Sequence, residues 1–245
     1  MSEIINESLS VDCVIFGFDF EKLKVLLVER ELKDEDSHKE VFKDYTLVGN
    51  HVYQDEKLED AAYRVLYDLT GFDNIYLEQF YTFGHPERLK HPRDTMWLKS
   101  IGLSPDARVV TVGYYSLLNI QEVELKHGDR NVAWFPVDAN VEFGFDHDQI
   151  LEKALQALRI KIRTNPIGFE LLPAKFTLSQ LQKLYEEILG VQFDKRNFRK
   201  KVQRMNYLVP LNEKQKGVAH KPAQLFMFSK DVYDKTKKDY FVFDV

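Results

Sequence analysis

Hydrophobic positions in the first part of the chain follow strand-like runs and one helical stripe. Two apolar runs, residues 10–20 and 24–30, are split by the polar pair Glu21-Lys22, which predicts a hairpin or two neighbouring strands. From residue 58 to 69, apolar side chains recur every third or fourth position, as on one face of a helix. Gly71 then provides a stop at the helix C-terminus.

The same alternation of strands and helices continues to about residue 165. Residues 75–83, 108–118 and 132–137 are typical of strands, and a helix with an apolar stripe starts at Asp146-His147. Residues 85–107 form a long polar stretch with three prolines, which indicates a lid or a binding loop. The pattern predicts an α/β domain over residues 1–165, with a mixed sheet and helices on both sides.

Residues 166–245 have a different pattern. Thr177 and Gln180 form a capping box before an amphipathic helix that ends at Gly190. Asp194 caps a second, basic helix over residues 195–205. Two short strands, 208–211 and 224–228, are joined by a basic loop. Helix, turn, basic helix and basic hairpin predict a winged helix-turn-helix domain.

The net charge of −5 is divided unevenly along the chain. Residues 1–150 carry a net −14, whereas residues 151–245 carry 19 basic and 10 acidic residues, a net +9. Such asymmetry indicates that one part meets a polyanion, although a solvated basic face has the same charge. The acidic N-terminus lacks the pattern of a signal peptide and no apolar run is long enough to span a membrane, so we expect a cytoplasmic protein. The single cysteine, Cys13, fits a buried strand position.

Residues 50–72 resemble the Nudix signature, Gly-x5-Glu-x7-Arg-Glu-U-x-Glu-Glu-x-Gly-U, where U is apolar. The matching residues are Glu56, Arg64, Leu66, Gly71 and Phe72. Asn50 replaces the leading glycine, Val65 replaces the glutamate after the arginine, and Asp68-Leu69 replaces the glutamate pair.

These replacements matter because Nudix hydrolysis needs a hard divalent cation that carboxylates hold on a pyrophosphate. Val65 and Leu69 remove carboxylates from the helical face that would bind the ion. The sequence therefore predicts no catalytic residue, no metal site and no cofactor. The alternative is an active Nudix hydrolase, acting on a nucleoside diphosphate derivative, that uses Asp68, Glu56 and further ligands.

The resemblance extends to Nudix-related transcriptional regulators over roughly residues 11–228. It is carried by residues 83–88, 134–137 and 145–147, and most specifically by FTLSQLQKLYEEILGVQFDKRNFRKKV. That family joins a Nudix-like sensor domain to a C-terminal winged helix, and its members are similar to regulators of NAD metabolism and of arabinose use. Residues 88–107 depart from the pattern and leave the effector open.

The resemblance implies a double-stranded DNA operator as partner. Arg196 and Asn197 suit bidentate contacts with guanine and adenine in the major groove. Ser179 and Gln180 begin the preceding helix and suit backbone contacts. The remaining predicted DNA-binding residues are Lys195, Arg199, Lys200, Gln203, Arg204, Lys214, Lys216 and Lys221.

For the effector site, the sequence predicts polar and aromatic residues around the altered Nudix signature: Glu29, Asn50, His51, His85, Arg88, Arg108 and Tyr114. Loss of the metal carboxylates favours a pentose such as arabinose, whereas the two arginines keep ADP-ribose open. We also expect a homodimer, because one winged helix covers only a short half-site.

Overall fold

The computed structural model describes residues 4–34, 36–71, 75–122, 131–219 and 221–236. The chain divides into two compact units, of which the first comprises Met1–Gly17, Lys24–Leu118 and Val123–Ala157, and the second Phe18–Leu23, Asn119–Glu122 and Leu158–Val245. The division falls inside the helix α3 (His147–Thr164). The domain boundary that the sequence predicts after residue 165 remains a prediction.

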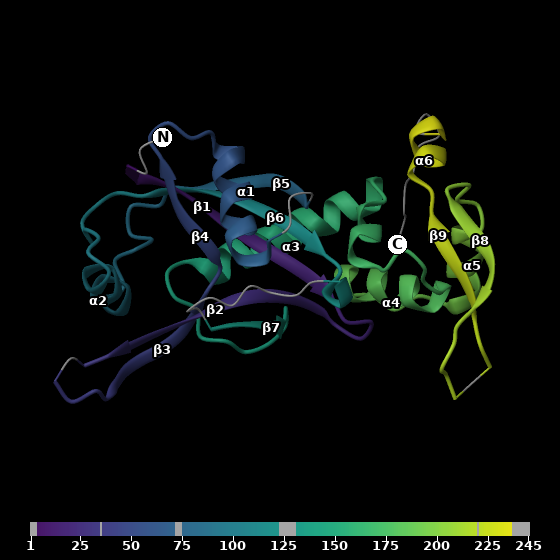
Figure 1. Ribbon diagram of the computed structural model, residues 1–245, viewed down its shortest axis with the longest axis horizontal. Coiled ribbons are helices and arrows are strands. Elements are labelled where there is room, and N and C mark those ends of the chain that lie inside the picture. The colour runs from purple at the N-terminus through teal and green to yellow at the C-terminus, as the bar shows by residue number, and fades with distance from the viewer. Residues whose placement is uncertain (1–3, 35, 72–74, 123–130, 220, 237–245) are drawn as a thin grey trace. The chain divides into compact units, whose positions relative to one another are not determined.

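The first unit contains a mixed sheet, which has seven strands over the described residues (Figure 1). The strands are β1 (Ile5–Phe18), β2 (Leu23–Lys33), β3 (Glu40–Thr46), β4 (Val48–Tyr53), β5 (Tyr76–Phe83), β6 (Val110–Leu118) and β7 (Val132–Pro136). Their order is β3-β2-β1-β6-β5, with β4 paired to β1 and β7 to β2. The β1–β6 pair is parallel and the other described pairs are antiparallel, so the predicted mixed sheet is confirmed.

The helix α1 (Leu58–Thr70) packs its apolar stripe on this sheet. Ala62 and Leu66 share one buried cluster with Val11 and Cys13 of β1, all with no exposed surface. Gly71 ends the helix at φ 74°, a left-handed conformation that glycine adopts without strain. The predicted helix is confirmed, and so is the buried position of Cys13, whose thiol pKa is raised by burial.

The stretch predicted as a loop, residues 85–107, contains the helix α2 (Pro92–Ser100), so this prediction was wrong in part. The local sequence explains the helix. His91 caps it, with Nδ1 accepting the backbone N–H of Arg93 at 3.4 Å, and Pro92 occupies the first turn, where a missing N–H costs nothing. Asp94 adds an acidic residue to that turn.

The second unit contains the predicted winged helix. The helices and strands that lie wholly within the second unit are η1 (Ile120–Glu122), η2 (Ile167–Leu171), α4 (Leu178–Leu189), α5 (Lys195–Val202), β8 (Leu208–Lys214), β9 (Gln224–Phe228) and α6 (Lys230–Thr236). β8 and β9 pair antiparallel and form the wing hairpin (Figure 1). The core is aromatic, with the rings of Phe169 and Phe228 stacked at 4.4 Å between centroids.

The predicted caps of both helices are present. Thr177 and Gln180 make the reciprocal capping box of α4, and Gly190 ends that helix in the left-handed conformation. Asp194 caps α5 by accepting the backbone N–H of Asn197 at 2.9 Å. α5 ends at Val202 rather than at residue 205, because the amide N–H groups of Arg204 and Met205 bond three residues back in a tight turn. Within the described residues, no helix has the length and apolar character needed to cross a membrane.

Candidate functional site

A cavity of about 230 Å³ lies in the first unit. Its walls come from β1, β2, β4, β6 and the segment that contains α2. Four of the residues predicted to bind the effector line it: Glu29, Asn50, His51 and Arg88. No residue of α1 appears among the described residues of its wall.

The structure does not bring His85, Arg108 and Tyr114 to this cavity. His85 and Arg108 are exposed, and Arg108 donates to the backbone oxygen of Gly84 at 3.3 Å. Tyr114 is buried in the core of the sheet, where its hydroxyl donates to Gln79 at 3.2 Å. Burial raises the Tyr114 pKa to about 12.

Arg88 occupies the cavity wall as part of a buried ion pair. Its guanidinium donates from Nε and Nη2 to both carboxylate oxygens of Asp146, at 2.9 and 2.7 Å, and from Nη1 to Thr111 Oγ1 at 3.0 Å. Only 8% of Arg88 is exposed. The two parallel hydrogen bonds of this pair fix the orientation of the guanidinium. The carboxylate of Asp146 also balances the positive charge of Arg88.

A second buried arginine, Arg30, joins α2 to the sheet. Its guanidinium binds both oxygens of Asp44 of β3, at 2.7 and 2.6 Å, and Asp94 of α2 at 2.7 Å. The rings of Trp97 and Phe145 lie 5.5 and 4.5 Å from its Cζ atom. Hydrogen bonds from Arg30 to the two aspartates raise its pKa despite the opposing effect of burial.

Asp12 of β1 presents a buried carboxylate to the same cavity. It is 6% exposed, and its oxygens lie 3.8 Å from Arg88 Nη2 and 3.7 Å from His147 Nε2, beyond hydrogen-bonding distance. Burial raises the Asp12 pKa, while Arg88 and a hydrogen bond with Thr111 act in the opposite direction.

His147 faces Asp12 as a neutral imidazole. Its Nδ1 accepts the backbone N–H of Leu47 at 2.8 Å, which leaves Nε2 as the protonated nitrogen on the side of Asp12. Burial lowers the His147 pKa to about 4. His147 therefore adds a hydrogen-bond donor to the cavity but no charge at neutral pH.

Two hydroxyl groups and a glycine complete this end of the cavity. Ser10 and Thr111 are register partners on β1 and β6, and their hydroxyls hydrogen-bond to each other. Gly49 is the register partner of Asp12 on β4. A Cβ atom at Gly49 would lie 2.0 Å from Asp12 Oδ1, so only glycine leaves room for the carboxylate.

The buried charges around the cavity do not balance. Each guanidinium is shared between two carboxylates, Arg88 between Asp146 and Asp12, and Arg30 between Asp44 and Asp94. Two positive charges thus meet four carboxylates. The wall therefore carries more acidic than basic groups, although Arg30, which lines the cavity, keeps a buried Nη1 without a hydrogen-bond partner among the described residues.

The Nudix signature residues are engaged in structural contacts. Arg64 binds both carboxylate oxygens of Glu56, at 2.7 and 2.8 Å, and lies over the Tyr53 ring at 4.0 Å. The Arg64 hydrogen bond lowers the Glu56 pKa. Asp68 is exposed on α1, Val65 is 5% exposed, and Phe72 falls outside the described residues. Among the described residues, no group of three or more His, Cys, Asp and Glu side chains is arranged to hold a metal ion.

The second unit presents a basic helix surface. Phe198 and Val202 bury one face of α5, and the Phe198 ring meets Tyr185 of α4 edge-on at 6.2 Å. The opposite face borders a shallow hollow lined by Asp194, Lys195, Arg196, Arg199, Lys200 and Gln203. All six side chains are exposed. We call the five residues other than Asp194 the α5 basic face.

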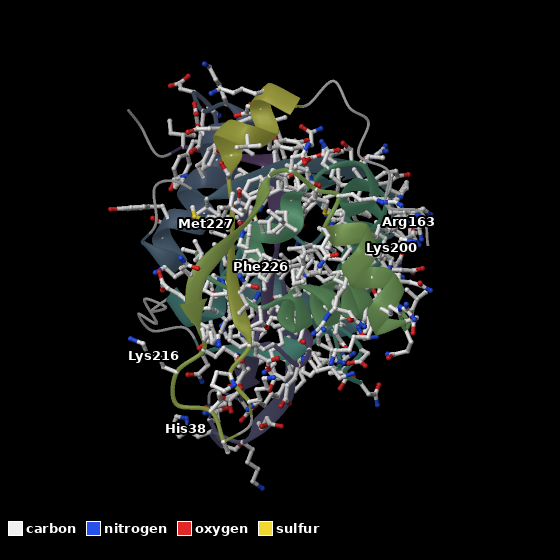
Figure 2. All side chains as sticks on the ribbon, turned by 90° about the vertical axis from the view of Figure 1, so that its right-hand side faces the viewer. His38, Arg163, Lys200, Lys216, Phe226 and Met227 are labelled. Atoms are coloured by element: carbon white, nitrogen blue, oxygen red, sulfur yellow. The ribbon has the colours of Figure 1, made fainter. Side chains whose placement is uncertain are left out.

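The remaining residues predicted to contact DNA belong to α4, to α5 and the turn after it, and to the wing. Lys216 is exposed on the loop between β8 and β9, and Lys200 is exposed on α5 (Figure 2). Asn197 and Arg204 are exposed in and after α5, and Lys214 and Lys221 are exposed on the wing. At the start of α4, Ser179 is exposed, while Gln180 is half-buried in the capping box.

Sequence reasoning missed six residues that line the cavity, Ser10, Asp12, Arg30, Trp97, Thr111 and His147, and the Asp94 carboxylate that accepts from Arg30. One signal was present. Ser10 and Asp12 are polar residues two positions apart in an apolar strand, so they point to the same face of the sheet. The sequence indicates Asp146-His147 as a helix start and as part of a family resemblance, but gives neither residue a place in the effector site.

Two family models match the chain. The NUDIX domain model covers residues 7–155, and the NrtR DNA-binding winged helix domain model covers residues 168–228. The chain is 30% identical over 239 residues to the ADPR responsive transcriptional repressor NtrR of Acinetobacter baylyi. The aligned residues cover 95% of this chain and 86% of that protein.

Solved structures agree with these matches over most of the chain. Shewanella oneidensis NrtR, in complex with a 27mer DNA, superposes with a TM-score of 0.71 at 28% identity, covering 92% of this chain and 95% of that chain. A MutT/nudix family protein from Enterococcus faecalis has a TM-score of 0.64 at 24% identity, covering 91% and 88%, and shares the fold.

Proposed function

Since the chain belongs to the family of transcriptional regulators that join a NUDIX domain to an NrtR DNA-binding winged helix domain, we propose that it represses transcription in response to ADP-ribose. The observation that carries this proposal is the α5 basic face, which is exposed and lies in the domain that the NrtR winged helix model covers. The Nudix cavity is the proposed effector site.

In the proposed complex with an operator, α5 enters the major groove. Arg196 and Asn197 in its first turn read base edges, and Lys195, Arg199 and Lys200 neutralise phosphates. Gln203 and Arg204 extend the contact past the helix end. Lys214, Lys216 and Lys221 of the wing, with Ser179 and Gln180 of α4, contact the backbone of the duplex.

ADP-ribose is the effector that the relative from Acinetobacter supports, because that protein is described as ADPR responsive. Nothing in the comparisons supports the pentose that the sequence favoured. Glu29, Asn50, His51 and Arg88 line the cavity and are the proposed contacts among the predicted residues. His85, Arg108 and Tyr114 lie away from it and are not part of this proposal.

We further propose that the domain senses without hydrolysing. Glu56 is bound on both oxygens by Arg64, and Asp68 is a single exposed carboxylate on α1. Glu56 and Asp68 therefore do not form, with further described carboxylates, a set of ligands for the divalent cation that hydrolysis needs. A homodimer on two half-sites remains part of the proposal, because it suits the short reach of one winged helix.

Fluorescence anisotropy on duplex DNA tests the regulator. The purified chain is used to select duplexes from a randomised pool, and the selected duplex is compared with a scrambled one of the same composition. We expect at least about a thousandfold preference for the selected duplex at physiological salt. Equal affinity for the two duplexes would overturn the proposal.

Calorimetry and product analysis test the sensor. We expect the full chain to bind ADP-ribose more tightly than arabinose, and to release no mononucleotide from ADP-ribose with Mg²⁺ above the uncatalysed rate. Turnover that Asp68→Ala abolishes would show that the domain is a hydrolase, while binding of arabinose alone would replace ADP-ribose as the effector.

A further inference from the structure

The segment that contains α2 separates two hollows of the first unit. We call residues 89–107 the α2 segment. It forms much of the wall of the Nudix cavity of about 230 Å³, where Leu98 is one of the lining residues. Trp97 and Ile101 line both this cavity and a second hollow of about 490 Å³. Movement of the α2 segment would therefore join the two hollows into one larger site.

The polar groups of the cavity are closed off from solvent. Asp12, Arg88 and His147 line the cavity, and all three are buried. Pockets that bind small molecules usually have a volume of about 300–1,000 Å³. Because the cavity is smaller than this, an effector of the size of a nucleotide has to displace the α2 segment to reach these groups.

The α2 segment is held firmly at its two ends and by few apolar contacts between them. Arg88 and Arg108 flank it and are bound to Asp146 and to the backbone oxygen of Gly84. Leu98 belongs to a small buried cluster which, over the described residues, shares no member with the cluster that α1 joins. A segment of this kind can open locally while the rest of the domain stays folded.

Polar contacts hold the middle of the segment closed. Asp94 accepts from Arg30 Nη2 at 2.7 Å, and Arg93 hydrogen-bonds to Glu142 at the surface. Arg30 also binds both oxygens of Asp44, so it stays paired when α2 moves away. Its Nη1 is buried without a hydrogen-bond partner among the described residues. The closed segment thus carries the cost of an unsatisfied donor, which solvent would relieve on opening.

We propose that the α2 segment is a lid over the Nudix cavity, that the ion pair of Asp94 and Arg30 is its latch, and that the lid opens for the effector to enter and leave. The inference rests on the proposed function, in which the effector is ADP-ribose. Asp94 is not among the described residues that line the cavity, so the latch acts on the rates of exchange without touching the effector. Because the latch is the same with and without effector, weakening it speeds entry and exit together.

Stopped-flow titration of the full chain with ADP-ribose, followed by tryptophan fluorescence, measures both rates. Asp94→Asn keeps an acceptor for the backbone N–H of Phe145 but removes the charge of the latch. We expect it to raise the association and dissociation rate constants by the same factor, about 10- to 100-fold, the range for a hydrogen bond to a charged group. The dissociation constant should stay nearly unchanged. Asp106 pairs with Lys90 inside the same segment, so Asp106→Asn is the matched control and should change neither rate.

Two results of this titration contradict the lid. Faster dissociation with unchanged association would mean that Asp94 stabilises the bound effector instead of closing a lid. Unchanged rates in Asp94→Asn would show that the ion pair is not a latch.

Thiol labelling of Leu98→Cys tests the lid without any ligand. Leu98 is buried under the α2 segment, whereas Cys13 is buried in the cluster that α1 joins. Labelling at position 98 that is faster than at Cys13 reports local opening, and Asp94→Asn should accelerate only this labelling. Equal labelling rates at the two positions would overturn the lid and leave the proposed function intact. Selective labelling at position 98 without binding of ADP-ribose would support the lid and overturn ADP-ribose as the effector.

Discussion

At the scale of single residues, burial rather than charge pairing determines the state of His147. The imidazole is 5% exposed, and desolvation lowers its pKa to about 4, with Arg88 acting in the same direction and Asp146 against it. An unfolded histidine has a pKa near 6.5. Between these two values the unfolded chain binds more protons than the folded chain, so folding stability falls as the pH falls.

We therefore expect the free energy of unfolding to decrease by about 2 kcal/mol between about pH 7 and pH 5 through His147 alone. No such effect is expected above the unfolded pKa, where the imidazole is neutral in both states. His147→Asn is the control, because Asn Oδ1 can accept the Leu47 N–H without titrating. Urea unfolding at several pH values measures the difference between the two proteins. Parallel pH profiles would show that His147 is not held neutral.

A second residue-scale prediction separates base reading from phosphate contact. Arg196 lies in the first turn of α5, whereas Lys216 lies on the loop of the wing (Figure 2). Arg196→Ala should weaken the binding free energy for a selected duplex by about 1–3 kcal/mol and reduce the base specificity at one position of the duplex. Lys216→Ala should weaken binding to every duplex alike and reduce the salt slope by about one unit. Anisotropy titrations over a salt series distinguish the two. An Arg196→Ala variant that weakens all duplexes equally would remove Arg196 from base reading.

The candidate site could be predicted only in part from single residues. Glu29, Asn50, His51 and Arg88 line the cavity because they lie on or beside strands that meet there. Tyr114 does not, since its position on β6 turns it into the core, and residue type alone gives no such direction. Asp12 was missed because its surroundings include Thr111 and His147, which lie 99 and 135 positions further along the chain.

At the scale of helices and strands, the sequence predicted the features that neighbouring residues in the chain determine, such as the ends of helices and their buried faces. Gly71 and Gly190 end α1 and α4, a capping box begins α4, and the apolar stripe of each helix predicts its buried face. α2 was missed because it has little apolar periodicity. It is anchored instead through Asp94, which is 2% exposed and bonds to Arg30 from a distant strand. That contact has no signature in the sequence around residues 92–100.

This anchor gives a prediction for α2. Asp94 accepts from Arg30 at 2.7 Å and from the backbone N–H of Phe145 at 3.1 Å. Asp94→Ala should lower the free energy of unfolding by about 1–3 kcal/mol, because it leaves a buried donor without its acceptor. It should also raise the hydrogen-exchange rates of the α2 amides. Asp106→Ala, on an exposed side chain of the same segment, should change neither. Unchanged exchange in Asp94→Ala would show that α2 is held by other contacts.

At the scale of the whole molecule, the uneven distribution of charge along the chain fits a division between the part that contacts DNA and the part that binds the effector. Residues 151–245 carry a net +9 and include the α5 basic face, while residues 1–150 carry a net −14 and include the cavity. The negative part repels DNA and leaves contact with the duplex to the winged helix. A chain of net −5 can therefore bind a polyanion with one part and a metabolite with the other.

If both sites belong to one regulator, their affinities are linked. We expect saturating ADP-ribose to weaken binding to the selected duplex by about 5- to 150-fold, the usual range of coupling between two sites. Linkage requires that saturating duplex weakens ADP-ribose binding by the same factor. Anisotropy measures the first factor and calorimetry the second, on the same preparation. Arg196→Ala should bind ADP-ribose normally in the absence of DNA, because Arg196 lies outside the cavity. Two clearly unequal factors would mean that ADP-ribose does not act through an equilibrium between the two sites of this chain.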